Sequence, residues 1–360
     1  MAMDLAKALL AHYDQHGRSL PWRGVHDPYL IWISEIMLQQ TTVSTVIPYY
    51  QRFIKQFPSV EKLADAPLDS VLSLWQGLGY YQRARNLHKS AGLVVSQWAG
   101  CFPVLLEEME SLPGIGPSTA AAILAISHDQ PHAILDGNVK RVLTRLKGID
   151  SPIEQLATVK ELWRIARALT PVDRPGDYAQ AIMDLGATLC SRKKPHCDAC
   201  PWLAVCQAAS AGNPERYPVR RPKKTKPKRH QLVGLILDSQ DRLLLLQRPE
   251  KGLLAGLWEP FGLDMTDSPE HKDQLFLQVD QLGIKGSVKE KKLPLVTHVF
   301  THFHLTVHAW LIRSASDRPN LNCERPYCWV GQKALDDKPV STLHAKVIER
   351  IGMKGQSIFM

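Results

Sequence analysis

The chain has 360 residues, 44% of them hydrophobic, and a formal net charge of +9. At roughly 100–200 residues per domain this length predicts two domains, and the composition excludes a wholly disordered chain. No apolar run reaches about 18 residues, and the first residues lack the basic and apolar regions of a secretory signal. We therefore expect a protein of the reducing cytoplasm, where its seven cysteines do not form a disulfide framework.

The excess positive charge is concentrated in one stretch. Residues 213–230 hold one acidic residue, Glu215, and eight basic ones: Arg216, Arg220, Arg221, Lys223, Lys224, Lys226, Lys228 and Arg229. Four prolines in this stretch prevent a helix and favour an extended connector. We place a linker at 213–229, between domains at 1–212 and 230–360. A solvated linker and a strap along DNA phosphates both remain open.

Before the linker, the spacing of apolar residues predicts helices and no strand. One helix starts near Leu5, and another, opened by the helix-start signal Asp27–Pro28, is expected over 29–46. Four shorter helices are expected at 68–75, 119–126, 139–146 and 159–169. This half of the chain is therefore predicted to be an all-α bundle.

Glu35 lies among apolar residues of the second expected helix. Burial raises the pKa of a carboxyl group and keeps it protonated near neutral pH, as a general acid requires. The alternative is an exposed glutamate on the polar face of the helix.

Two glycines, Gly114 and Gly116, lie in the run 112–116, and a helix of small residues follows. Glycines allow close backbone approach, and the amides of such a turn and the next helix N-terminus can bind phosphate. The pattern predicts a helix–hairpin–helix that grips DNA without reading its sequence; an ordinary helix corner is the alternative.

Asp136 comes just before the helix expected at 139–146, where a helix N-cap is its simplest role. Beside a phosphate-binding hairpin, it is also well placed to face a bound sugar. Cleavage of a glycosidic bond usually needs one carboxyl group that donates a proton and one that stabilises an oxocarbenium-like sugar. We therefore expect Glu35 to protonate a departing base and Asp136 to stabilise the deoxyribose.

Four cysteines lie within seventeen residues: Cys190, Cys197, Cys200 and Cys206. Both zinc and a 4Fe–4S cluster accept four thiolates. Zinc ribbons usually carry two Cys-x2-Cys pairs, whereas this chain has one pair and uneven spacing. The pattern therefore favours one 4Fe–4S cluster with a structural or DNA-docking role, with zinc as the alternative.

After the linker the pattern changes. Short apolar runs at 232–237 and 243–246 predict a β-hairpin, and 298–312 contains alternating apolar residues. The second domain is therefore predicted to be α+β.

These motifs, in this order, closely resemble those of the adenine DNA glycosylase family, a branch of the helix–hairpin–helix superfamily that includes endonuclease III. The resemblance covers nearly the whole chain, through Glu35-x-Met37-Leu38-Gln39-Gln40-Thr41, 77–81, 112–116, 135–138 and the four cysteines. It implies a multidomain protein: an all-α helix–hairpin–helix glycosylase of two helical modules with an iron–sulfur cluster loop, and an α+β Nudix-like C-terminal domain.

The resemblance also implies the reaction: a monomer excises adenine opposite 8-oxoguanine or guanine in double-stranded DNA during base excision repair. Glu35 then protonates N7 of the adenine and later helps to activate water. Asp136 stabilises the sugar intermediate, and Asn138 supports this pair.

Further roles are implied for residues that touch DNA. The adenine pocket consists of Trp22, Arg23, Leu38, Val43 and Gln180, while Gln40 and Tyr80 enter the base stack. Gly114, Gly116 and Lys140 contact the DNA backbone. Endonuclease III relatives carry a Schiff-base lysine where this chain has Ser118, so we expect a glycosylase without strong lyase activity, apart from incidental cleavage by Lys140.

In the second domain, the resemblance implies recognition of 8-oxoguanine by Phe300, Thr301 and His302, where relatives commonly show Phe-Ser-His. No Arg-Glu-x-x-Glu-Glu run follows His230, so we expect this domain to bind and not to hydrolyse.

The sequence argues against two other functions. An endonuclease III-like pyrimidine glycosylase–lyase conflicts with Ser118 and with the second domain. An iron–sulfur DNA-binding protein without turnover conflicts with the pairing of Glu35 and Asp136. The resemblance finally places the protein in the bacterial cytoplasm, in association with the nucleoid.

Overall fold

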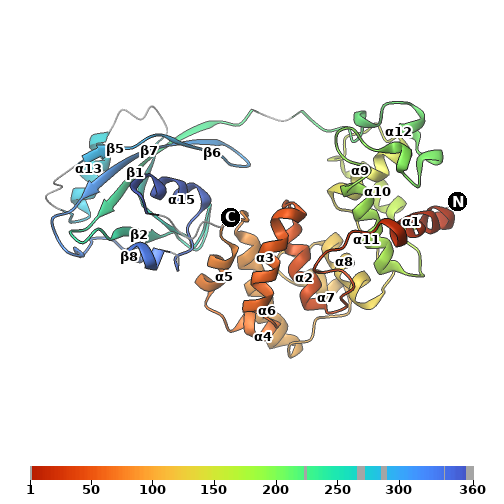
Figure 1. The fold of residues 1–360 in the computed structure, drawn as a ribbon, viewed down its shortest axis with the longest axis horizontal. Coiled ribbons are helices and arrows are strands. Elements are labelled where there is room, and N and C mark those ends of the chain that lie inside the picture. Colours follow the sequence, from red (N-terminus) through yellow and green to blue (C-terminus); the bar gives the residue numbers. More distant parts are fainter. Residues whose placement is uncertain (1, 223–224, 266–271, 285–289, 336, 354–360) are drawn as a thin grey trace. The chain divides into compact units, whose positions relative to one another are not determined.

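The computed structural model describes residues 2–222, 225–265, 272–284, 290–335 and 337–353 (Figure 1). The chain forms two compact units, one made of 1–65 and 86–223 and the other of 66–85 and 224–360. Lys223 and Lys224 of the basic linker lie outside the described residues. The domain limits given above remain a prediction.

Helices make up the regular structure between residues 2 and 222, as the sequence predicts. They are α1 (Ala2–His16), α2 (Pro28–Leu38), α3 (Val43–Gln56), α4 (Val60–Ala64), α5 (Leu68–Trp75), α6 (Gln82–Trp98), α7 (Leu106–Ser111), α8 (Pro117–His128), α9 (Gly137–Lys147), α10 (Leu156–Leu169), α11 (Pro175–Ala187) and α12 (Gln207–Ser210). Short 3-10 turns lie at η1 (Cys197–Ala199), η2 (Leu203–Val205) and η3 (Pro214–Arg216). None of the helices described is long and apolar enough to cross a membrane.

The single helix expected at 29–46 is wrong, because two helices, α2 and α3, occupy this range. Gln40 has a left-handed backbone with φ of +59°, which a continuous α-helix cannot contain. The expected start is confirmed: the Asp27 side chain accepts a 2.8 Å hydrogen bond from the Tyr29 N–H, and Pro28 opens α2. The break leaves Gln40 exposed on a turn.

Small residues bring the central helices of the first unit close together. Helix α8 buries several alanines, and a Cβ added to Gly176 of α11 would lie 2.6 Å from the Ala125 carbonyl oxygen. No larger residue fits at Gly176 without moving one helix. The apolar core around these two helices also includes α1, α9 and α10.

The second unit holds a mixed sheet of eight strands among its described residues (Figure 1). They are β1 (Lys228–Leu237), β2 (Leu243–Gln247), β3 (Trp258–Glu259), β4 (Phe261–Met265), β5 (Glu290–Lys292), β6 (Val296–Val299), β7 (His304–Arg313) and β8 (Tyr327–Val330). The central path is β3-β2-β1-β7-β5, with β4 paired to β1, β6 to β7 and β8 to β2. The predicted hairpin is confirmed as β1–β2, whereas the parallel pairing of β1 with β7 was not foreseen.

Alternation along β1 builds two separate cores, because successive side chains of a strand face opposite sides of the sheet. Val233 and Leu235 join the core beneath α15 (Thr342–Ile348). Leu232 and Ile236 join the core beneath α13 (Lys272–Gln281). The unit is completed by α14 (Gln332–Leu335) and η4 (Glu349–Ile351), so the predicted α+β class is confirmed.

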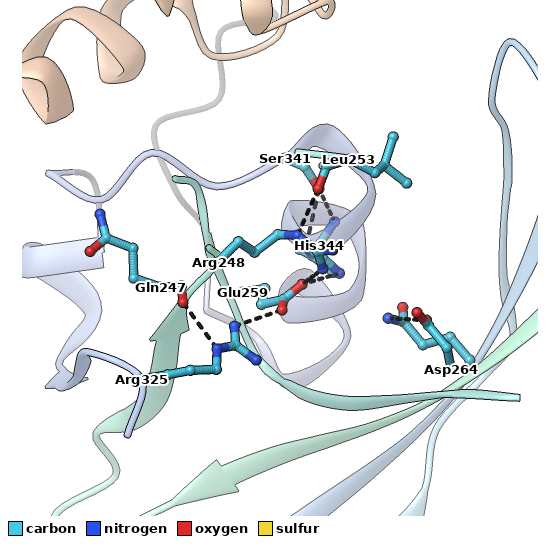
Figure 2. Close-up of polar contacts among 9 residues, drawn as sticks. Gln247, Arg248, Leu253, Glu259, Asp264, Arg325, Ser341 and His344 are labelled. Carbon is cyan, nitrogen blue, oxygen red and sulfur yellow. Dashed lines mark hydrogen bonds and ion pairs between the residues drawn. The ribbon is translucent and has the colours of Figure 1, made fainter. Parts of the chain in front are cut away.

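A buried carboxylate ties the end of this sheet together (Figure 2). Glu259 is 6% exposed and accepts hydrogen bonds from Arg248 and, at 2.8 Å, from Arg325. The His344 ring lies behind it, with a pKa lowered to about 4, chiefly by burial. Because two guanidinium groups compensate the buried charge, Glu259 joins β3 to the loop before it and to the loop before β8.

Candidate active site

A cavity of about 780 Å³ lies in the first unit, where α2 and the turn after it face α8, α11 and the start of α9. The charged side chains that line it are Arg18, Arg23, Glu35 and Asp136. A small organic ligand fits a cavity of this size.

Glu35 reaches this cavity from the last turns of α2, whose other faces are buried in the core. Its pKa is raised to about 7, first by burial and then by the negative charge of Asp136, while the charge of Arg23 opposes the shift. The group therefore holds a proton near neutral pH, as a general acid must.

Asp136 caps α9 and lines the same cavity. Its Oδ1 accepts a 2.7 Å hydrogen bond from the Val139 N–H, so both the capping role and the proximity to Glu35 hold. The pKa of Asp136 is also raised, by burial, although backbone hydrogen bonds and the charges of Arg141 and Lys140 offset part of the rise. The backbone N–H groups and the two cations stabilise the ionised form of Asp136. Glu35 has only one cation near it, so its ionised form is stabilised less.

Asn138 also lines the cavity, and its amide oxygen accepts a 3.0 Å hydrogen bond from Arg141. The start of α9 lies directly against α11. A Cβ added to Gly186 would lie 2.8 Å from the Asn138 Cβ and within 3.4 Å of its backbone. Glycine at position 186 is thus required for the two helices to meet at the cavity wall.

The glycine hairpin joins α7 to α8, as the sequence predicts. Gly114 has φ of +84°, and its missing side chain leaves room for Asn86, which lies 3.0 Å from the position of a Cβ. Gly116 is the N-cap of α8. Ser118 lines the cavity, and its hydroxyl accepts a 2.9 Å hydrogen bond from the Leu135 N–H, which ties the hairpin to the segment that carries Asp136.

The five residues expected to form an adenine pocket all line the cavity: Trp22, Arg23, Leu38, Val43 and Gln180. The Trp22 ring is buried and packs edge-on against Tyr50, with 5.2 Å between the ring centres. Gln40 also lines the cavity, from the exposed turn after α2. Tyr80 is 47% exposed and belongs to the second unit.

Two residues of the cavity region were missed by sequence reasoning, Arg18 and Asp184. Asp184 is buried on α11 and accepts hydrogen bonds from Arg18 and from Arg23. A carboxylate within the small and apolar residues of 179–187 was the available signal, because buried acids are seldom left unpaired.

The four cysteines of the predicted cluster line one small cavity of about 30 Å³. The pKa of Cys200 is raised to about 11, chiefly by burial and in part by the other three thiols. No group of three or more His, Cys, Asp or Glu side chains in the described part of the chain has the arrangement of a site for one metal ion.

Arg145 was also missed by sequence reasoning, because it lies within the apolar stripe of α9. It is 2% exposed, and its guanidinium donates to the Cys190 Sγ at 3.3 Å and to the Ser191 carbonyl at 2.7 Å.

In the second unit, Phe300, Thr301 and His302 form the turn between β6 and β7. Thr301 and His302 are exposed. The Phe300 ring stacks on Phe303 with 4.7 Å between ring centres, and its carbonyl accepts a 2.7 Å hydrogen bond from the Lys226 Nζ. The turn thus packs against the Phe303 ring and is held by a hydrogen bond from Lys226 of the linker.

An all-helical unit with a glycine hairpin, and a cavity lined by two carboxyl groups, define a DNA glycosylase of the helix–hairpin–helix class. Residues 33–168 match the family described as HhH-GPD superfamily base excision DNA repair protein, and 232–350 match the NUDIX domain. A thermostable thymine-DNA glycosylase structure is 28% identical with a TM-score of 0.54, over 58% of this chain and 97% of that one. A non-covalent endonuclease III–DNA complex shares the fold at 20% identity with a TM-score of 0.50, over 59% of this chain and 98% of that one.

Sequence relatives narrow the class. The adenine DNA glycosylase of Buchnera aphidicola subsp. Acyrthosiphon pisum (strain APS) is 38% identical over 309 residues, which cover 86% of each chain. The chain belongs to the adenine DNA glycosylase family. It is a DNA glycosylase of base excision repair, as the sequence predicts.

The close contact of α9 with α11 is testable at Gly186. Replacement with alanine forces the two helices apart, so we expect Gly186→Ala to lower the free energy of unfolding of the first unit by about 1–3 kcal/mol. Gly92→Ala is the matched control, because Gly92 is exposed on α6 with nothing within 4 Å of an added Cβ. Gly92→Ala is expected to raise the free energy of unfolding by roughly 0.5–1 kcal/mol. A Gly186→Ala protein as stable as the wild type in chemical denaturation would contradict the close contact.

Proposed function

We propose that the protein excises adenine placed opposite 8-oxoguanine or guanine in duplex DNA, as a glycosylase without strand-cleaving activity. The observation that carries the proposal is that Glu35 and Asp136 line one base-sized cavity, where the pKa of Glu35 is raised to about 7 and backbone N–H groups and cations offset part of the rise at Asp136. The printed name of the curated relatives, adenine DNA glycosylase, supports adenine as the departing base.

In the proposed reaction, the adenine turns out of the duplex into the cavity, and Glu35 protonates it at N7. Protonation makes the base a better leaving group, so the bond to the sugar breaks and an oxocarbenium-like deoxyribose forms. The carboxylate of Asp136 stabilises this cation, and Asn138 supports the pair. Glu35, now ionised, accepts a proton from the water that attacks the sugar.

The walls of the cavity suit a flipped purine. Trp22, Leu38 and Val43 offer apolar faces, while Arg23 and Gln180 offer polar groups for the edge of the base. Gln40 and Tyr80 are proposed to fill the space that the adenine leaves in the stack. The exposure of both side chains supports this role.

The hairpin is proposed to hold the DNA backbone through the turn at Gly114 and Gly116, with Lys140 as an added cation. Ser118 stands where a lyase would have its imine-forming lysine. A hydroxyl group cannot form a Schiff base, and the Ser118 Oγ is already bonded to the Leu135 N–H. Both facts support a monofunctional enzyme.

We also propose that Cys190, Cys197, Cys200 and Cys206 hold one 4Fe–4S cluster. An all-sulfur donor set around one small cavity fits such a group, and Arg145 donates a hydrogen bond to the Cys190 sulfur. When bound, the cluster would brace the loop 190–206, which carries Arg192, Lys193 and Lys194 toward phosphates.

The second unit is proposed to read the 8-oxoguanine with Phe300, Thr301 and His302. The packed rings behind this turn and the exposure of Thr301 and His302 support the role. Binding without hydrolysis follows from α13, which carries only Asp273 and Asp280 as acidic residues, too few for a magnesium-holding Nudix helix. We propose that the enzyme acts as a monomer on duplex DNA in the cytoplasm, at the nucleoid.

A panel of duplexes tests the proposed function. Adenine is placed opposite 8-oxoguanine, guanine or thymine, and release of free adenine is measured for the full chain. We expect release from the first two duplexes and little from the third. If only the thymine duplex reacts, or none does, the proposal is wrong. Efficient borohydride capture on DNA with damaged pyrimidines would instead support a glycosylase–lyase.

The role of Glu35 predicts a pH dependence. Its pKa of about 7 means that the rate of adenine release falls as the pH rises through 7, because the acid loses its proton. Glu35→Gln is expected to lower the rate by about 10²–10⁴ below pH 7, where Glu35 holds its proton, and by less at higher pH, with DNA binding retained.

The control for this variant is Glu107→Gln, because Glu107 is exposed on α7. Since the folded state raises the pKa of Glu35, its ionisation costs stability as the pH rises above the unfolded value, and Glu35→Gln should be at least as stable as the wild type above pH 7. A rate that does not change through pH 7, or an active Glu35→Gln protein, would contradict the role.

The proposed cluster is tested by Cys197→Ala. Loss of one thiolate should remove iron from the purified protein and abolish visible absorbance, whereas Cys101→Ala, at an exposed cysteine on another part of the chain, should keep both. Zinc without iron in the wild-type protein would overturn the assignment.

A further inference from the structure

One carboxylate on α11 accepts several hydrogen bonds from a loop beside the cavity. Asp184 is 6% exposed, and its Oδ2 accepts a 3.1 Å hydrogen bond from the backbone N–H of Arg18. Its Oδ1 accepts from the Arg18 Nε at 3.0 Å, the Arg18 Nη2 at 2.6 Å and the Arg23 Nη2 at 2.7 Å. These four donors belong to two arginines of the stretch 17–27, which forms neither helix nor strand, so Asp184 fixes two points of this irregular loop.

This loop carries part of the cavity wall. Arg23 lines the cavity, and its Nη1 donates a 2.9 Å hydrogen bond to the Tyr13 hydroxyl on α1. Its charge is close enough to Glu35 to lower the pKa of that carboxyl, against burial and Asp136. The place of the Arg23 guanidinium therefore bears on when Glu35 holds its proton.

We propose that Asp184 is a positioning residue for base release, which holds Arg18 and Arg23 as one wall of the cavity and fixes how strongly Arg23 acts on Glu35. The Arg18 and Arg23 guanidinium groups both donate to the Asp184 Oδ1, and two cations this close would repel each other without an anion between them. Asp184 supplies that anion and offsets part of the positive charge that Arg23 presents to the cavity. The inference rests on the proposed function, because Arg23 and Glu35 matter in this way only if a base is protonated there.

The charged groups around Asp184 and Glu35 determine what a substitution of Asp184 changes. Glu35 faces Asp136 at the start of α9 and Arg23 on the loop, while Asp184 faces Arg18, Arg23 and the Tyr13 ring on α1. In Asp184→Asn the shape is kept and the anion is lost, while the Tyr13 hydroxyl still holds one end of Arg23. The Arg23 charge then acts on Glu35 without compensation and lowers the pKa of Glu35 further.

The test is the rate of adenine release at saturating enzyme, measured on both sides of pH 7. We expect Asp184→Asn to slow release roughly 10–100-fold at neutral pH, as small misplacements of binding groups do. The fall in rate with rising pH should also move to lower pH. Asp177→Asn is the matched control: it makes the same change on the same helix, at an aspartate that pairs with Arg174 at 2.8 Å and is half-exposed. Its rate and pH profile should follow the wild type.

A double substitution separates positioning from a general structural effect. If Asp184 acts through Arg23, then adding Asp184→Asn to Arg23→Gln should leave the pH profile of Arg23→Gln unchanged. A shift of the same size in both backgrounds would overturn the proposal. Asp184→Glu, which keeps the charge, should restore the wild-type pH profile even if its rate is reduced, and it carries the test if Asp184→Asn does not fold. A displaced profile in Asp184→Glu would also overturn the proposal.

Failure of this inference and failure of the proposed function give different results. A wild-type protein that releases no adenine from the 8-oxoguanine or guanine duplex refutes the proposed function. A wild-type protein that releases adenine, together with an Asp184→Asn protein that matches Asp177→Asn in rate and pH profile, refutes the inference alone.

Discussion

Two carboxyl groups line one cavity, and the negative charge of Asp136 makes it costly for Glu35 to lose its proton. Burial alone raises the pKa of an acid, but burial alone gives no second group of opposite character. Asp136 differs because backbone N–H groups and two cations favour its anion. The cavity therefore holds a proton donor and an anion together, as departure of a protonated base from a sugar requires.

The packing of the first unit serves this pair. Glu35 lies on a helix whose other faces are buried, so it cannot turn to solvent without unpacking α2. Glycines at 176 and 186 let α11 approach α8 and α9, and α11 contributes Gln180 and Met183 to the cavity wall. The same helix brings Asp184 to the irregular loop that carries Trp22 and Arg23. Small residues in the helices thus determine the position of charged residues at the site.

Local chemistry in the sequence predicted much of this arrangement. An acid in an apolar helix, a glycine hairpin and an N-capping aspartate each have a local signature, and Glu35, Ser118 and Asp136 do line one cavity. The end of α2 could not be predicted, because the residues from 29 to 46 keep a helical pattern and nothing in the sequence indicates the left-handed backbone of Gln40. The roles of Asp184 and Arg145 have no local signature, because their partners are distant in sequence. Asp184 binds Arg18, and Arg145 binds Cys190. The parallel pairing of β1 with β7 likewise depends on tertiary contacts that periodicity does not reveal.

The proton on Glu35 can be observed directly. Carbon-13 NMR of protein labelled at its glutamate side-chain carboxyl groups, with Glu35→Gln to assign the signal, follows the ionisation of this one group. A pKa of about 7 in the wild type, and a lower value in Asp136→Asn, is the expected result. A signal that titrates near the ordinary value of 4.5 in both proteins would show that the two carboxyl groups do not act on each other.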